Sequence, residues 1–204
     1  MARPVLFIFA RAPAYGAAKT RLARDVGAAE ALRFQRHALR SVIRHFAGSP
    51  RVEVVLAVTP RSRLSDPAWP RGLARVDQGR GDLGVRMMQT LRLAGRRPAL
   101  LIGSDIPEAR AHHIEDALGC LTRARFVLGP TEDGGYWLIG ARMPWLITPR
   151  LLDDVRWSSR HALEDTRARL RDVALLGETL SDVDDGESLS RLKLREGRHQ
   201  SRHI

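Results

Sequence analysis

Cysteine and long hydrophobic runs are both scarce in this chain. Cys120 is the single cysteine among 204 residues, which excludes an internal disulfide and a cysteine-rich zinc site. The longest apolar run near the start, Val5–Ala10, is far shorter than the roughly 18 residues of a membrane span. It is also too short for the apolar core of a signal peptide. We therefore expect a soluble protein of the reducing cytoplasm.

Lysine is almost missing too, although the chain is strongly basic. Lys19 and Lys193 are the two lysines among 34 basic residues, so the other 32 are arginines, and the formal net charge is +11. The arginines are spread along the chain without interleaved aromatic residues, as a GC-rich coding bias would produce. The charge allows non-specific attraction to polyanions, but no nucleic-acid-binding module is recognisable. Small phosphorylated ligands are therefore the expected partners, rather than nucleic acid or a membrane.

Short apolar runs alternate with helical patterns. The runs predict strands at Val5–Ala10, Val52–Thr59, Arg75–Asp77, Ala99–Gly103, Phe126–Leu128 and Tyr136–Gly140. Apolar residues at helical spacing predict helices around residues 31–46, 85–93 and 114–121. This alternation indicates an α/β fold with three layers, α/β/α, and a mostly parallel mixed sheet. We expect one domain over residues 1–196 and a basic, flexible tail over 197–204, and the oligomeric state, a homodimer included, is left open.

The first predicted strand runs directly into a basic turn, and helical sequence follows. Gly16 lies in this turn, and Arg11, Lys19 and Arg21 bring three cations to it. Backbone N–H groups and a helix N-terminus after a buried strand form a typical phosphate site. The alternative is a surface turn with solvated charges.

Asp105 follows another predicted strand, in the segment Gly103–Pro107. Ligands of such sheets bind beyond the carboxyl ends of the strands, where a carboxylate suits Mg²⁺ or Mn²⁺ on a diphosphate. Asp184, in an acidic cluster near the end of the chain, could supply a second ligand. The alternatives are a helix N-cap for Asp105 and an acidic helix start for Asp184.

The segment Gly129–Gly140 combines glycines, acids and aromatic residues. Gly134 and Gly135 let a ligand approach the backbone, and Asp133 precedes them. An ordinary hairpin turn is the simpler interpretation. The histidines show no metal-ligand spacing, since the adjacent His112 and His113 should diverge on a helix.

Together these motifs resemble a known bacterial family. The matching segments are Phe9–Pro13 with Lys19–Leu22, Gly81–Met87, Gly103–Pro107, Gly129–Gly140, Trp157-Ser158, Thr166 and Asp182–Asp184. They are similar to the glycosyltransferase-A-like proteins that include presumed arsenosugar-biosynthesis glycosyltransferases. Phospholactate guanylyltransferase and the molybdenum-cofactor nucleotidyltransferases are more distantly similar.

The resemblance implies a nucleotide-diphospho-sugar transferase fold and a role for each motif. The basic turn would contact phosphates and Asp105 would bind the metal. Nucleotide contacts are implied for Gly81, Asp82, Gly84 and Arg86, and acceptor contacts for Gly134, Gly135, Tyr136 and Trp157. The usual D-x-D metal motif is reduced to Ser104-Asp105, and Val85 and Ile106 stand where an acid and a cysteine are expected.

These residues favour a metal-dependent glycosyltransferase that uses a nucleotide sugar and a small acceptor. Lys19 and Arg21 would stabilise the leaving group, and Asp133 would serve as general base, or else bind metal or acceptor. The alternative is a nucleotidyltransferase that joins an NTP to a phosphorylated acceptor and releases pyrophosphate. A catalytically silent nucleotide sensor or an arginine-rich nucleic-acid-binding protein is the third hypothesis.

Overall fold

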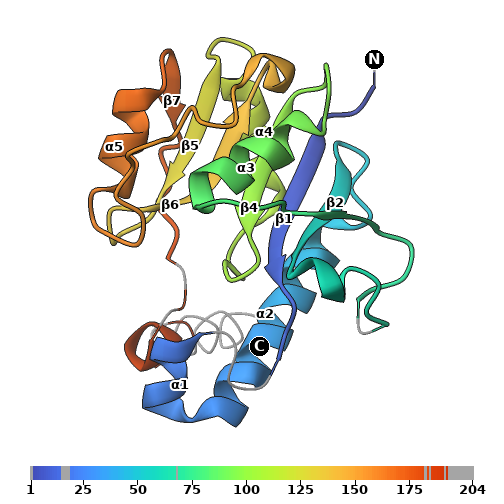
Figure 1. Ribbon diagram of the computed structural model, residues 1–204, viewed down its shortest axis with the longest axis vertical. Coiled ribbons are helices and arrows are strands. Elements are labelled where there is room, and N and C mark those ends of the chain that lie inside the picture. Colours follow the sequence, from blue (N-terminus) through green and yellow to red (C-terminus); the bar gives the residue numbers. More distant parts are fainter. Residues whose placement is uncertain are drawn as a thin grey trace, which may run out of the picture.

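A central β-sheet organises the computed structural model, which describes residues 2–14, 19–67, 69–181, 183, 185–190 and 192 (Figure 1). Within this described part of the chain, seven strands form one sheet in the order β3-β2-β1-β4-β6-β5-β7. The strands are β1 (Val5–Arg11), β2 (Glu53–Thr59), β3 (Ala74–Asp77), β4 (Ala99–Gly103), β5 (Phe126–Pro130), β6 (Tyr136–Ala141) and β7 (Val173–Leu175). β6 runs antiparallel to its neighbours β4 and β5, whereas the other pairs are parallel. The predicted fold class, α/β with a mostly parallel mixed sheet, is thereby confirmed.

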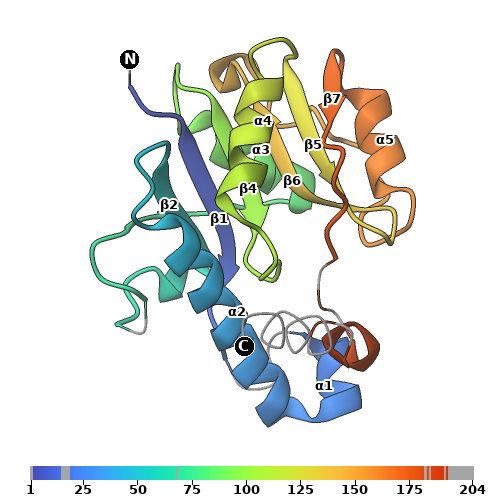
Figure 2. The ribbon, with the colours of Figure 1, turned by 180° about the vertical axis from the view of Figure 1, so that it is seen from behind.

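Helices cover both faces of the sheet. α2 and α4 lie on one face and α3 lies on the other, as the two opposite views show (Figures 1 and 2). The helices are α1 (Thr20–Val26), α2 (Ala28–Phe46), α3 (Leu83–Arg92), α4 (Ala111–Cys120) and α5 (Ala162–Arg169), with short 3₁₀ turns η1 (Arg61–Arg63) and η2 (Pro144–Leu146). None of the described helices is long and apolar enough to cross a membrane.

Alternate residues of β1 show how the strands divide the core. Leu6 and Ile8 pack with α2 and α4, while Val5 and Phe7 pack with α3 on the opposite face. Successive side chains of a strand point to opposite faces, so a strand covered on both sides must be apolar throughout. This is why the buried strands are continuous apolar runs in the sequence.

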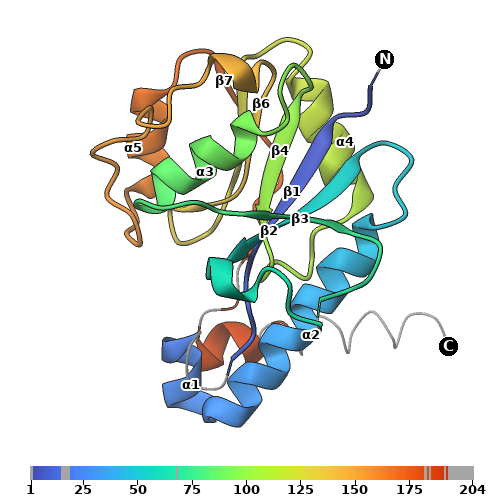
Figure 3. The ribbon, with the colours of Figure 1, turned by 45° about the vertical axis from the view of Figure 1, so that its right-hand side comes forward.

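A separate small cluster ties α1 to the end of the described chain (Figure 3). Leu22 of α1 is fully buried among residues of α2 and the C-terminal residues Val183, Leu189 and Leu192. Asp25 of α1 also accepts a hydrogen bond at 2.8 Å from the backbone N–H of Gly186. The position of α1, which directly follows Lys19, therefore depends on residues far along the sequence.

Candidate functional site

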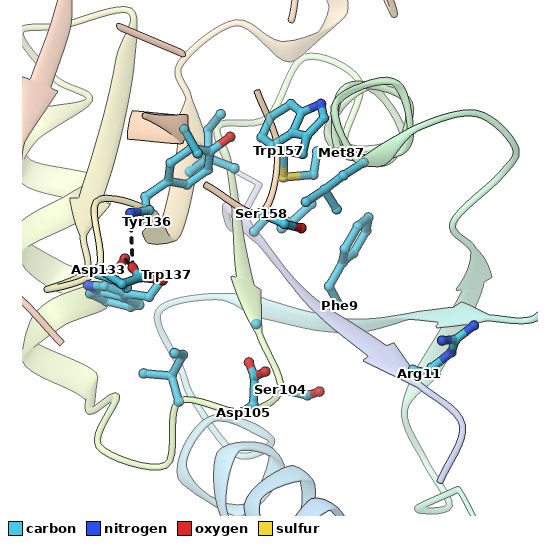
Figure 4. Close-up of a pocket in the computed structure, with 18 of the residues that line it drawn as sticks. Phe9, Arg11, Met87, Ser104, Asp105, Asp133, Tyr136, Trp137, Trp157 and Ser158 are labelled. Atoms are coloured by element: carbon cyan, nitrogen blue, oxygen red, sulfur yellow. Dashed lines mark hydrogen bonds between the residues drawn. The ribbon is translucent and has the colours of Figure 1, made fainter. Parts of the chain in front are cut away.

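A cavity of about 930 Å³ opens at the edge of the sheet where the parallel strands end. β1 contributes Arg11, the end of β4 leads to Asp105, and the turn between β5 and β6 contributes Asp133 (Figure 4). β6 begins at this same edge because it runs antiparallel to β4. The topology therefore brings together three residues that lie far apart in the sequence.

Lys19 and Asp105 form an ion pair inside this cavity. Nζ of Lys19 donates to Oδ2 of Asp105 at 2.6 Å, and the two side chains are 10% and 33% exposed. Desolvation disfavours the charged carboxylate, but the charge and hydrogen bond of Lys19 outweigh it and hold the pKa of Asp105 below its ordinary value. Asp105 is not a helix N-cap, because α4 begins at Ala111 with Arg110 before it.

Arg86 and Arg11 are two of the arginines that line the cavity with this pair. Arg86 lies on α3, and its guanidinium donates at 2.9 Å to Oε1 of Gln78, a side chain only 3% exposed. Gln78 also donates to the carbonyl oxygens of Ala57, at 2.8 Å, and Ala10, at 3.4 Å. Burial and the nearby charge of Arg11 lower the pKa of Arg86 despite Asp82. An anion between the two arginines would relieve their repulsion.

Asp133 lies in the tight turn between β5 and β6. Its Oδ1 accepts hydrogen bonds from the hydroxyl of Thr131 at 2.5 Å and from the backbone N–H of Gly135 at 3.1 Å. Its Oδ2 makes no hydrogen bond to any described residue, and the side chain borders the cavity. The backbone therefore forms the hairpin turn of the simpler interpretation. In this turn one carboxylate oxygen of Asp133 is left for a ligand.

Gly134 allows a close approach of protein backbone at this turn. Its φ is +85°, and an added Cβ would lie 2.2 Å from the carbonyl oxygen of Arg160. The carbonyl oxygen of Gly134 also accepts a hydrogen bond at 2.9 Å from the N–H of Leu163. Gly134 thus holds the segment before α5 against the β5–β6 turn, whereas Gly135 borders the cavity itself.

An aromatic and apolar wall completes the cavity. Tyr136 and Trp157 meet edge to face with ring centroids 6.4 Å apart, and Phe9 and Met87 lie on the same side (Figure 4). Burial raises the pKa of Tyr136 well above its ordinary value, so its hydroxyl stays protonated. The hydroxyl of Thr166 lies 3.4 Å from that of Tyr136. Such a wall suits the less polar part of a ligand.

Three of the residues predicted to contact the nucleotide, Gly81, Asp82 and Gly84, do not border the cavity. Asp82 caps α3, since its Oδ1 accepts from the N–H of Val85 at 2.8 Å, and Gly81 has a φ of +109° before the cap. Gly84 packs against Trp157 and Leu152. The structure therefore gives these residues roles in placing α3, and nucleotide contact by them stays a prediction.

Replacing Gly84 by alanine should destabilise the protein. The new Cβ would lie 2.7 Å from Cζ2 of Trp157 and 3.0 Å from Cβ of Leu152. Overpacking of this kind costs about 1–3 kcal/mol, more than the roughly 1 kcal/mol that alanine gains in helix propensity. Urea unfolding measures the difference. Gly119→Ala on α4 is the matched control, because no atom lies within 4 Å of its added Cβ. A stability unchanged or raised in Gly84→Ala would contradict this packing.

His112 and His113 converge, so the expectation that they diverge on a helix was wrong. Their ring centroids are 3.9 Å apart, and both Nε2 atoms face Glu178, at 3.5 and 2.9 Å from Oε2. The cause is that Nδ1 of His113 accepts a hydrogen bond from the N–H of Arg110, which draws the ring back over the start of α4. Nε2 of His113 then carries the ring proton, so the group does not suit a metal ion.

Some expected site residues lie outside the described part of the chain, namely Gly16, Asp182, Asp184 and the tail. Arg21 borders the cavity with Lys19, as the basic turn suggested. The sequence reasoning missed Gln78 and Arg160, which also line it. Gln78 directly follows a predicted strand, and this position alone could have indicated that Gln78 lies near the ligand.

Comparison with known proteins identifies the kind of fold that carries this cavity. The sequence model of a family described as "Uncharacterized protein conserved in bacteria (DUF2064)" matches residues 42–159. None of the curated proteins matches the chain. Among solved structures, a proposed nucleotide-diphospho-sugar transferase from Desulfovibrio desulfuricans G20 matches with a TM-score of 0.79 and 26% identity. The match covers 94% of this chain and 87% of that one.

More distant structures share the fold. A 4-diphosphocytidyl-2C-methyl-D-erythritol synthase from Anaerococcus prevotii has a TM-score of 0.59 at 10% identity, over 93% of this chain and 96% of that one. A CMP:2-keto-3-deoxy-manno-octonic acid synthetase complexed with CTP has a TM-score of 0.54 at 14% identity, over 97% and 100%. The expected nucleotide-diphospho-sugar transferase type of fold and the resemblance that implied it are both confirmed.

Proposed function

The chain belongs to the DUF2064 family, and from this premise and the cavity's geometry we propose a transferase that moves a sugar from a nucleotide-diphospho-sugar to a small acceptor. The observation that carries the proposal is that Asp105 and three cations, Lys19, Arg11 and Arg86, share one cavity with an aromatic wall. A volume of about 930 Å³ lies within the range of small-ligand sites. The matched transferase structures support the reaction class.

The cations would bind the diphosphate of the donor. Arginine grips phosphate oxygens with a planar fork of N–H groups, while lysine acts as a point charge. Gln78 holds Arg86 in place, so the guanidinium of Arg86 is oriented before the ligand arrives. Charge that develops on the leaving diphosphate would thus meet a group already oriented toward it, which is where electrostatic catalysis is strongest.

The residues of the cavity fit a divalent metal ion of the kind that the fold family implies. The carboxylate of Asp105 is one-third exposed, and Mg²⁺ or Mn²⁺ binds through one or two carboxylates together with substrate phosphates and water. Asp105 would hold the ion, which would neutralise charge on the diphosphate. Asp133 is the other described carboxylate that lines the cavity.

The acceptor would lie between Asp133 and the aromatic wall. Oδ2 of Asp133 is available to accept a proton from an acceptor hydroxyl, since Oδ1 is occupied by Thr131 and Gly135. The turn fixes the carboxylate without using that second oxygen. Tyr136 and Trp157 would pack against the acceptor and exclude water from the reacting atoms.

Nucleotidyl transfer is the second candidate, and the cytidylyltransferase-like structures that share the fold favour it. The phosphates of an NTP would then bind to the same cations, and pyrophosphate would be the leaving group. The two reactions differ in the ligand that binds and in the product, so one set of experiments separates them.

A thermal-shift panel with nucleotide sugars, nucleoside diphosphates and NTPs, each with and without Mn²⁺, tests the proposal. A ligand at 100 times its Kd should add about 2.7 kcal/mol of stability. We expect the largest shift from a nucleotide sugar with Mn²⁺, and loss of that shift in Arg86→Met. Arg40→Met, on the exposed face of α2, is the matched control. Preference for an NTP would favour nucleotidyl transfer, and no response to any nucleotide would contradict both candidates.

A further inference from the structure

Lys19 occupies the carboxylate that the proposed metal ion would need. Its Nζ lies 2.6 Å from Oδ2 of Asp105, and the lysine side chain is only 10% exposed. This is a half-enclosed contact within the cavity, unlike the exposed ion pairs elsewhere on the chain, such as Arg33 with Glu30. A contact that is screened little by solvent is costly to break without a replacement partner.

The backbone keeps Lys19 at this place. Its φ of 54° and ψ of 47° are left-handed, and its carbonyl oxygen accepts the hydrogen bond from the N–H of Ala23 that begins α1. α1 is in turn anchored through the buried Leu22. The ammonium therefore reaches Asp105 from a fixed base, and only the side chain needs to move for it to leave.

A divalent cation that binds the carboxylate of Asp105 must compete with the ammonium of Lys19, which already binds Oδ2. A cation that approaches Asp105 while Lys19 is bound meets a positive charge next to its ligand. The ammonium of Lys19 can leave Asp105 at low cost in free energy only if another anion becomes its partner. A diphosphate supplies that anion, and Arg11 lines the cavity where the diphosphate would bind.

We infer that Lys19 withholds Asp105 from divalent cations until a diphosphate enters the cavity, so that metal and nucleotide bind cooperatively. This inference rests on the proposed function, since it concerns the same cavity. By linkage, each ligand must raise the affinity for the other by the same factor. The nucleotide-free protein should accordingly bind Mn²⁺ weakly.

Binding of Mn²⁺ to the nucleotide-free protein, followed through the EPR signal of the free ion, tests the inference. Lys19→Met should bind Mn²⁺ about tenfold or more tightly than the wild type, within the usual range of coupling between two ligands. Arg40→Met is the matched control, because Arg40 lies on the exposed face of α2 and does not line the cavity, and its Mn²⁺ affinity should not change. Lys19→Gln repeats the test with a polar side chain, and thermal unfolding confirms that each variant is folded.

The double variant Lys19→Met/Asp105→Asn identifies the site. It should lose the Mn²⁺ binding gained in Lys19→Met. An affinity that does not rise in either lysine variant, or a rise that Asp105→Asn leaves intact, overturns the inference. Failure of the proposed function would look different, because it would appear as a missing nucleotide response in the wild type.

Discussion

Asp105→Asn is expected to lower the rate of transfer by about 10³-fold, which corresponds to about 4 kcal/mol of activation free energy. Asparagine has nearly the same shape, and its Oδ1 still accepts a hydrogen bond from Lys19. It lacks the negative charge that would hold a divalent cation on the donor diphosphate. The effect of Mn²⁺ on nucleotide affinity should disappear with it, and isothermal calorimetry with and without the ion measures that effect.

Asp116→Asn is the control for this variant, because Asp116 is an exposed carboxylate on α4 away from the cavity. Its activity should match the wild type. If Asp105→Asn keeps the full Mn²⁺ dependence of nucleotide binding, Asp105 does not hold the metal. The enzymatic interpretation of its pairing with Lys19 would then have to be abandoned.

Asp133→Asn should reduce kcat by about 10²- to 10⁴-fold, the usual contribution of a general base. Asparagine keeps an oxygen at Oδ1, so the bonds from Thr131 and Gly135 and the shape of the turn should persist. The change falls on Oδ2, which becomes an amide and cannot accept a proton from the acceptor. Steady-state kinetics should therefore show a lower kcat with little change in the KM of the donor.

Glu132→Gln serves as the matched control, since Glu132 is the neighbouring exposed acid in the same turn and does not border the cavity. A normal kcat in Asp133→Asn, combined with a raised KM for the acceptor, would assign Asp133 to acceptor binding instead. The thermal stability of both variants shows whether the turn is intact.

The buried strands and the edge strand β3 could be predicted from the sequence, but the other edge strand, β7, could not. β4 was predicted at its observed bounds, Ala99–Gly103, because a strand covered on both faces is a continuous apolar run. β7 is three residues long and half exposed, so its sequence carries no such signal. It becomes a strand through its pairing with β5, a contact between distant parts of the chain.

The site was partly predictable for a similar reason. Asp105 and Arg11 follow buried strands, and the rule that ligands bind beyond the carboxyl ends of strands singles them out. The role of Gln78 depends on simultaneous contacts with Ala10, Ala57 and Arg86, which no local pattern contains. Phe9 lines the cavity although it belongs to an apolar strand, where burial in the core is the ordinary expectation.

The packing of α1 against the C-terminal residues has a consequence for synthesis of the protein. Lys19 and Leu22 leave the ribosome early, but Val183 and Leu189, which bury Leu22, are translated more than a hundred residues later. The nascent chain can complete its sheet before the segment that carries Lys19 has its final support. The proposed donor pocket would therefore be the last part to mature, and an incomplete chain released early would not sequester nucleotide sugar.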